Sequence, residues 1–164
     1  MTIKYSFAPI TSGDTRILVL GSLPGDKSLT EQRYYAHPQN QFWTLISGVI
    51  GGDLRALDYD ARLAALVEAG IGLWDVIGAA VRAGSSDAAI CDASANDLIG
   101  LIRTLPKLRA IAFNGGTALL IGKRQLIDAG NVLPIIALPS SSPLHTVGVG
   151  AKQPVWDLLK QHLR

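Results

Sequence analysis

The chain has few residues that build a covalent or metal-bound centre. Cys91 is the single cysteine among 164 residues, so an internal disulfide is excluded. One thiol also cannot supply an iron–sulfur cluster or a cysteine-ligated zinc site. The histidines and acidic residues form no close grouping with the spacing of metal ligands. We therefore expect no metal, no iron–sulfur cluster and no other cofactor.

Charge and long apolar runs are also scarce. Charged residues make up 17% of the chain and the formal net charge is +2, so the wide basic face of many nucleic-acid-binding proteins is lacking. No apolar run approaches the length of a membrane span, and the first residues do not combine a basic stretch with an apolar core. We expect a cytoplasmic protein with no membrane partner, and any contact with nucleic acid must be local.

Apolar sequence, by contrast, is plentiful. Hydrophobic residues make up 48% of the chain, which suits one globular domain over residues 1–164. Four apolar, β-branched runs are typical of buried strands: Arg16 to Leu20, Ile71 to Val76, Leu108 to Phe113 and Leu133 to Leu138. Because helical segments separate these runs, the strands should pair in parallel. The pattern predicts a three-layer α/β/α sandwich around a central four-stranded, mainly parallel sheet.

Helical periodicity covers the segments between the predicted strands, at 42–50, 63–67, 98–105, 118–127 and 154–163. Pro154 is expected at the first position of the last helix, where proline is favoured. Ser28 to Glu31 matches a capping box, which favours a structural role for its polar residues. The stretch 83–89 is expected to be a surface loop.

Polar and turn-forming residues follow each predicted strand. Gly21 to Gly25 follow the first strand, Asp75 ends the second, Asn114 to Gly116 follow the third, and Leu138 to His145 follow the fourth. The carboxyl ends of parallel strands meet at one edge of the sheet, where ligands usually bind. Amides, hydroxyls and imidazoles dominate there, without a dense cluster of acids or lysines. The edge therefore suits a neutral, hydrogen-bonding ligand such as a nucleobase.

Three stretches at this edge resemble the two signature motifs of the uracil-DNA glycosylase superfamily. They are Gly21–Gly25 (GSLPG) running on to Tyr34–Trp43 (YYAHPQNQFW), and Leu138–Thr146 (LPSSSPLHT). The second stretch is most similar to the hypoxanthine-DNA glycosylase branch, with further similarity to mismatch-specific uracil/thymine-DNA glycosylases. The resemblance implies a monofunctional enzyme of base excision repair that flips a deaminated base, uracil or hypoxanthine, out of DNA and hydrolyses its N-glycosidic bond. It also implies a monomer that works on the DNA of the nucleoid.

The first motif then supplies base-binding and catalytic candidates. The resemblance assigns base binding to Ser22, Leu23, Tyr35 and His37, with the Tyr35 ring stacked on the base. Superfamily members usually carry a water-orienting Asp or Asn where this chain has Leu23, and leucine cannot do that work. In the most similar branch the catalytic role falls to the residue matching Asn40. From the residues alone Asn40 is a helix N-cap, and both roles can coexist. His37 is equally well explained as a structural histidine.

Asn114 and the second motif complete the predicted site. Asn114 is expected to read the base edge, because an amide offers both a donor and an acceptor, although Asn-Gly-Gly is also an ordinary turn. Leu144 falls at the position of the wedge that fills the space left by the flipped base. His145 is expected to contact the DNA backbone or to stabilise negative charge on the leaving base. The hydroxyls and amides that would bind phosphates belong to Ser140, Ser141 and Ser142. A proline-bracketed surface turn is the alternative.

Two other functions stay open at this stage. A module that recognises damaged DNA or a nucleotide without cutting would explain Leu23 and the lack of a clear general base. A small-molecule hydrolase using the three serines is the other candidate, but no Gly-x-Ser-x-Gly elbow is present. No lysine lies at the centre of either motif, so a Schiff-base lyase step is not expected.

Overall fold

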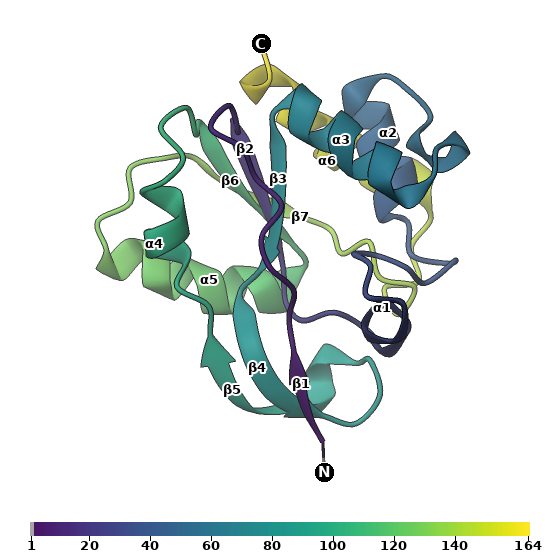
Figure 1. The fold of residues 1–164 in the computed structure, drawn as a ribbon, viewed down its shortest axis with the longest axis vertical. Helices are drawn as coiled ribbons and strands as arrows, with labels where there is room; N and C mark the ends of the chain where they lie inside the picture. Colours follow the sequence, from purple (N-terminus) through teal and green to yellow (C-terminus); the bar gives the residue numbers. More distant parts are fainter. Residues whose placement is uncertain (1) are drawn as a thin grey trace.

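A four-stranded parallel sheet forms the centre of the computed structural model, which describes residues 2–164 (Figure 1). The strand order is β3-β2-β6-β7, and every neighbouring pair is parallel. The strands are β2 (Ile17–Gly21), β3 (Ile71–Asp75), β6 (Ala110–Asn114) and β7 (Ile135–Leu138). Each lies within two residues of its predicted bounds, so the predicted sheet is confirmed.

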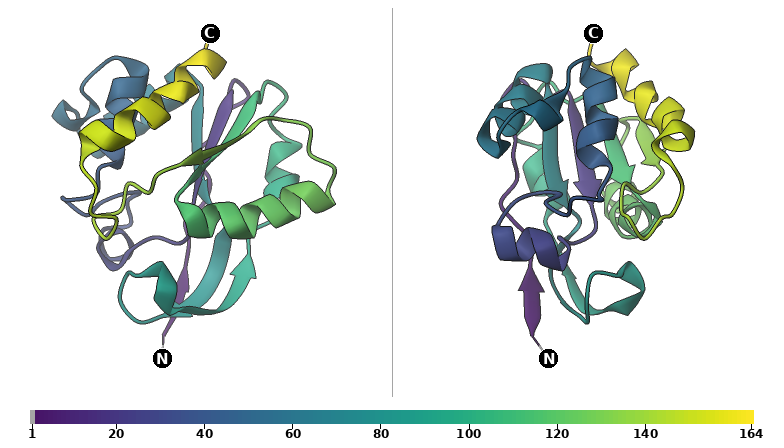
Figure 2. Two further views of the ribbon diagram at one scale, coloured as in Figure 1. Left: turned by 180° about the vertical axis from the view of Figure 1, so that it is seen from behind. Right: turned by 90° about the vertical axis from the view of Figure 1, so that its right-hand side faces the viewer.

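Helices cover both faces of this sheet (Figures 1 and 2). One face carries α2 (Phe42–Ile50), α3 (Tyr59–Ala69) and α6 (Val149–Trp156), and the other carries α4 (Leu98–Ile102) and α5 (Gly116–Asp128). Along β2, Ile17 and Val19 enter the core of the first face, whereas Leu18 and Leu20 enter the core of the second. All four side chains are fully buried, and each such burial stabilises the fold by about 2 kcal/mol. The three-layer prediction is confirmed.

A second, antiparallel sheet was not predicted. It contains β1 (Ile3–Tyr5), β4 (Ile77–Arg82) and β5 (Ile90–Ala95) in the order β1-β4-β5. Glycine and alanine fill much of β4, and most of β5 is exposed, so neither shows the apolar signal of a buried strand. The β4–β5 loop, residues 83–89 with a short 3-10 turn at Asp87–Ala89, is a loop as expected. Because β4 follows β3 directly, this sheet extends from the carboxyl edge of the parallel sheet (Figure 1).

The capping box predicted at Ser28 is wrong. Helix α1 (Asp26–Glu31) begins after Gly25, so Ser28 lies inside the helix and is buried. Its Oγ instead accepts a hydrogen bond from the backbone N–H of Ala36 at 3.0 Å. The residue is structural, as expected, but it holds the turn between α1 and α2.

Two of the helical predictions, 154–163 and 98–105, also need correction. Pro154 lies inside α6 because that helix begins at Val149, whose side chain packs against the core. The helix predicted to reach Leu105 ends at Ile102, since the residue before Pro106 disfavours helical backbone. Beyond α6 the chain continues as a 3-10 segment at Asp157–His162. Within residues 2–164, no helix has both the length and the apolar character to span a membrane.

Candidate functional site

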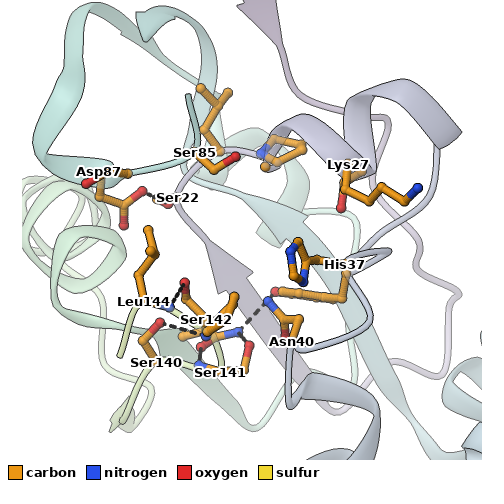
Figure 3. A pocket seen from close by; sticks show the side chains of 18 of the residues that line it. Ser22, Lys27, His37, Asn40, Ser85, Asp87, Ser140, Ser141, Ser142 and Leu144 are labelled. Atoms are coloured by element: carbon orange, nitrogen blue, oxygen red, sulfur yellow. Dashed lines mark hydrogen bonds between the residues drawn. The ribbon is translucent and has the colours of Figure 1, made fainter. Parts of the chain in front are cut away.

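A cavity of about 430 Å³ opens at the carboxyl edge of the parallel sheet. Its walls come from the segment after β2, the turn between α1 and α2, the β4–β5 loop and the segment after β7, together with the last residues of β3 and β6. All eleven candidates from the sequence line it: Ser22, Leu23, Tyr35, His37, Asn40, Asn114, Ser140, Ser141, Ser142, Leu144 and His145. Figure 3 shows Ser22 on one side, His37 and Asn40 on the other, and the three serines between them.

Asn114, at the end of β6, connects three walls of the cavity. Its Nδ2 donates to Ser141 Oγ at 2.9 Å and to Tyr35 Oη at 3.3 Å, and its Oδ1 accepts from the Ser141 backbone N–H at 2.9 Å. Both amide hydrogens are therefore engaged, and one lone pair of Oδ1 is left over. The amide fixes the second motif and Tyr35 relative to the sheet.

Tyr35 is held in a strained backbone conformation. Its φ of 54° lies in the left-handed region, which costs a bulky residue about 1–2 kcal/mol. Its ring stacks on Phe42, with centroids 3.9 Å apart and planes 17° apart. Since Phe42 covers one face, the opposite face is the one that can meet a ligand in the cavity. Burial raises the pKa of the Tyr35 hydroxyl and the charge of Asp75 raises it further, so this hydroxyl stays neutral.

Asn40 has a structural contact as well as a place in the cavity wall. Its Oδ1 accepts the backbone N–H of Phe42 at 2.9 Å, the first residue of α2. The N-cap position itself belongs to Gln41, so the predicted cap lies one residue earlier than a standard N-cap. The backbone N–H of Asn40 donates to the His37 carbonyl at 2.9 Å. An amide oxygen has a second lone pair, so the cap leaves Asn40 able to hold a water.

The second motif is anchored from two helices. The backbone N–H of Gln41, before α2, donates to the Ser141 carbonyl at 2.9 Å. Trp156 of α6 donates its Nε1–H to the Pro139 carbonyl at 3.0 Å. Ser141 is fully buried, whereas Ser140 and Ser142 are half-buried at the cavity. The buried serine serves the scaffold, and its neighbours are the ones open to a ligand.

The tip of the second motif is exposed. Leu144 is 62% exposed, although it lines the cavity together with the exposed His145. Lys152 of α6, which is buried, donates its Nζ–H to the His145 carbonyl at 3.1 Å, and burial lowers the pKa of this lysine. The tip therefore exposes an apolar side chain to solvent, while the Lys152 side chain holds its backbone in place. Sequence reasoning did not find Lys152.

The first motif is braced by a buried arginine that sequence reasoning missed. Arg82, at the end of β4, donates to the Pro24 carbonyl at 2.6 Å, the Leu23 carbonyl at 3.4 Å and the Gly84 carbonyl at 2.7 Å. The side chain of Leu23 is 6% exposed and packs in the core beside α5. Ser22 donates its hydroxyl to Asp87 Oδ1 at 2.7 Å, which ties the motif to the β4–β5 loop (Figure 3).

Asp75, at the end of β3, was placed at this edge from the sequence but was given no functional role. It lines the cavity and is 4% exposed, and in the part of the chain that the structure describes its Oδ2 has no hydrogen-bond partner. Burial raises the pKa of this carboxyl to about 7; the charge of Asp87 contributes to the rise, and Arg82 opposes it. The signal in the sequence was an acid at the end of a run of buried apolar residues. Within residues 2–164, no three His, Cys, Asp or Glu side chains are grouped to hold a metal.

Glycine at position 21 is required by this arrangement. A Cβ on Gly21 would lie 2.6 Å from Asp75 Oδ1 and 3.2 Å from Tyr35 Oη. The first distance is closer than real Cβ atoms come to other atoms, so any side chain here would displace the carboxyl. The first glycine of the motif thus makes room for two polar groups at the floor of the cavity.

This α/β/α domain, with a cavity at the carboxyl edge of its parallel sheet, is of the class that binds ligands at that edge. The model of the uracil DNA glycosylase superfamily matches residues 8–160. A Methanosarcina acetivorans protein named hypoxanthine DNA glycosylase is 39% identical over 98% of this chain and 99% of its own length. One of the same name from Methanosarcina barkeri is 45% identical over 68% of this chain and 71% of its own length.

A solved structure agrees with these matches. The solution NMR structure of a candidate uracil DNA glycosylase from Methanosarcina acetivorans superposes with a TM-score of 0.88 and 39% identity, over 99% of each chain. The chain belongs to the uracil DNA glycosylase superfamily. The predicted family and the prediction of a DNA glycosylase are confirmed, while the roles of individual residues stay predictions.

Proposed function

We propose that the chain hydrolyses the N-glycosidic bond of hypoxanthine in DNA and, as a second substrate, that of uracil. The observation that carries the proposal is the shared cavity: both motifs, far apart in the chain, line one space at the carboxyl edge of the sheet. The names of the two Methanosarcina relatives support hypoxanthine as the base. Release of a deaminated base is the first step of base excision repair.

The reaction converts a damaged nucleotide into an abasic site. The bond between C1′ of the deoxyribose and the base nitrogen breaks, and its electron pair leaves with the base. A water oxygen then bonds to C1′, and a proton from that water ends on the base. Because the sugar resembles an oxocarbenium ion at the transition state, the protein accelerates the reaction by stabilising the leaving base and placing the water.

Asn40 is the residue that places the water in this proposal. Its Oδ1 is already fixed by the Phe42 N–H, so the free lone pair has a defined direction. An amide is not a strong base, and the buried Leu23 offers no carboxylate or amide in its place. Most of the rate must then come from stabilising the leaving group, and we expect modest turnover.

The flipped base would be held between an aromatic ring and polar groups. The face of Tyr35 opposite Phe42 stacks on the base, which is worth about 1–3 kcal/mol. Ser22 and His37 bound the base from the two sides seen in Figure 3. Asn114 keeps the Tyr35 hydroxyl in position, with one lone pair left for the base edge. Leu23 lines the cavity with its backbone, and its buried side chain supports the cavity floor.

The second motif would hold the DNA. Ser140 and Ser142 offer hydroxyls to phosphates, and Ser141 fixes their backbone. Leu144 fills the gap left in the base stack, which explains why an exposed leucine stands at the tip. His145, next to it, stabilises negative charge on the leaving base or the DNA backbone.

The acting unit in this proposal is a monomer on the DNA of the nucleoid. None of the steps above uses a metal or a cofactor.

The test is base release from oligonucleotides that carry a single hypoxanthine or uracil, single- and double-stranded, followed by alkaline cleavage. Wild type is compared with Asn40→Ala and Leu144→Ala. We expect strand scission with wild type, with hypoxanthine ranked first, and its loss in Asn40→Ala. Binding without scission on either base would overturn the proposal and identify a module that recognises damaged DNA without cutting.

A further inference from the structure

The cavity contains one buried acid for which the proposed mechanism has no use. Asp75 is more than nine-tenths buried, lines the cavity, and keeps an oxygen, Oδ2, without a hydrogen-bond partner among residues 2–164. An unpaired polar atom in such a place costs the fold about 1–3 kcal/mol. The Asp75 carboxyl occupies space that a side chain at position 21 would fill, so the glycine there accommodates the carboxyl. A polar group kept at this cost in a ligand cavity points to a contact with the ligand.

The groups that face Asp75 determine its charge. Asp87 on the β4–β5 loop repels a negative charge there, and Arg82 of β4 attracts it. Tyr34 and Tyr35 lie in the segment between α1 and α2. Burial raises the pKa of both hydroxyls, and the negative charge of Asp75 raises it further. Burial is the largest influence on Asp75 and raises its pKa to about 7. The carboxyl is therefore mainly neutral in slightly acidic solution and ionised in slightly basic solution.

We propose that Asp75, in its neutral form, contacts the lactam edge of the flipped base, donating its O–H to the base carbonyl oxygen and accepting the adjacent ring N–H. This inference rests on the proposed function, because it names the group that reads and stabilises the base in that reaction. A neutral carboxyl has one donor and one acceptor side by side, which matches the O=C–N–H edge of hypoxanthine or uracil.

The same hydrogen bond would assist the chemistry. When the glycosidic bond breaks, its electron pair enters the base and the carbonyl oxygen gains negative charge. A carboxylic acid kept neutral by burial can donate a hydrogen bond to such an oxygen, and this bond strengthens as the charge develops. Asp75 keeps its proton throughout and forms no covalent bond. Ionised Asp75 would offer only acceptors and would repel both the carbonyl oxygen and the departing anion.

Asparagine at position 75 is the variant that isolates this effect. An amide has the same adjacent donor and acceptor but does not ionise, so Asp75→Asn keeps the contact and loses the pH dependence. Asp75→Ala removes both. His37 and His145 also line the cavity, but both variants retain them. Any difference in pH profile between wild type and Asp75→Asn therefore belongs to position 75.

The experiment measures the rate of hypoxanthine release from pH 6 to pH 8.5, with enzyme in excess over DNA but below saturation, so that the profile reports the free protein. We expect the wild-type rate to fall about tenfold per pH unit above pH 7. The rate of Asp75→Asn should vary by no more than about twofold between pH 6 and pH 8.5. Asp75→Ala should be slower than wild type by about a hundredfold at pH 6. Thermal denaturation of each variant verifies the fold.

The outcomes separate this inference from the proposed function. Wild type that releases hypoxanthine while Asp75→Asn shows the same decline with pH would overturn the role of Asp75 and leave the glycosylase intact. A wild-type rate in Asp75→Ala would do the same. Wild type that releases no base at any pH would overturn the proposed function, and the inference with it.

Discussion

Asn114 and Asp75 end the two strands that flank β2, and their side chains are in opposite situations. The Asn114 amide makes three hydrogen bonds, to Tyr35 and Ser141, whereas Oδ2 of Asp75 has no partner. Both residues are buried, line the cavity and end an apolar strand. The difference shows that position alone does not define a binding residue. Asn114 spends both amide hydrogens and one lone pair on the scaffold and keeps one lone pair for a ligand, whereas Oδ2 of Asp75 is wholly available to one.

Asn40 lies between these two cases. Its Oδ1 caps the start of α2 through the Phe42 N–H, yet the side chain also lines the cavity. Residues of this kind combine a scaffold contact with an open hydrogen-bonding site, so their substitution changes stability and activity together. Matched variants at this position separate the two contributions.

The largest effect is expected at Asn40, where the two situations meet. Asn40→Ala should reduce the rate of hypoxanthine release by about 10²–10³, because the group that places the water is lost. Asn40→Ser is the matched variant, since serine also caps helices but has no amide. We expect its melting temperature to stay near that of wild type while its activity falls as far as in Asn40→Ala. If Asn40→Ser is as active as wild type, Asn40 serves only as a helix cap and does not place the water.

Stability against pH sharpens the case of Asp75. Its pKa is about 7 in the folded protein and near 3.8 when unfolded, so the folded state holds the proton more tightly. Between these values the unfolded chain ionises first, and stability falls as pH rises. Wild type should lose about 3 kcal/mol of unfolding free energy between pH 5 and pH 8 relative to Asp75→Asn. Urea denaturation at both pH values measures this, and parallel curves would show that Asp75 has an ordinary pKa.

Gly21 tests whether the space around Asp75 matters. Gly21→Ala puts a Cβ 2.6 Å from the position of Asp75 Oδ1 and should displace the carboxyl. We expect base release to slow by about a hundredfold, because displacements of about 1 Å have effects of this size. Gly13→Ala is the control, since a Cβ there meets nothing within 4 Å. If Gly21→Ala is as active as the Gly13→Ala control, the position of the Asp75 carboxyl does not matter for base release.

Asn114 should behave as scaffold. Asn114→Ala leaves the Ser141 N–H and the Tyr35 hydroxyl without their partner, and we expect a loss of about 2 kcal/mol in unfolding free energy at every pH. Asn131 provides the comparison, because its side chain forms two hydrogen bonds with the backbone of Leu133 and lies outside the cavity. Urea denaturation of both alanine variants measures the difference. A loss at Asn114 no larger than at Asn131 would break the contrast with Asp75.

The smallest effect is expected at Leu144, at the exposed tip of the second motif. Leu144→Ala should leave the melting temperature unchanged, because the side chain is 62% exposed. Release from duplex DNA should slow by about tenfold, since the wedge fills the gap in the stack, while release from single strands changes little. Comparing the two substrates measures the wedge alone. An equal loss on both substrates would assign Leu144 to the base cavity instead.

Much of this architecture is visible in the sequence because strong apolar runs define it. The parallel strands, the helices on both faces and the convergence of the two motifs follow from periodicity and from the edge rule for parallel sheets. The second sheet does not, since β4 is rich in glycine and alanine and β5 is exposed. Arg82, which braces the first motif, lies in that sheet and was missed with it.

The pairing of side chains is also invisible in the sequence. Asn114 and Asp75 follow similar apolar runs, and only the tertiary contacts of Asn114 with Ser141 and Tyr35 distinguish them. The cap at Asn40 was predicted from its place before an amphipathic helix, but local pattern fixed it only to within one residue. Long-range hydrogen bonds decide which polar residues are free, and a single sequence does not encode them in any short pattern.

The most direct test of the account is detection of the free base. Wild-type protein in stoichiometric excess is incubated at pH 6.5 with duplex DNA that carries one hypoxanthine, and the small-molecule fraction is analysed by mass spectrometry. A glycosylase mechanism that uses Asn40 predicts free hypoxanthine in an amount equal to the abasic strand, and much less from Asn40→Ser. Tight binding of the duplex with no hypoxanthine released would contradict it.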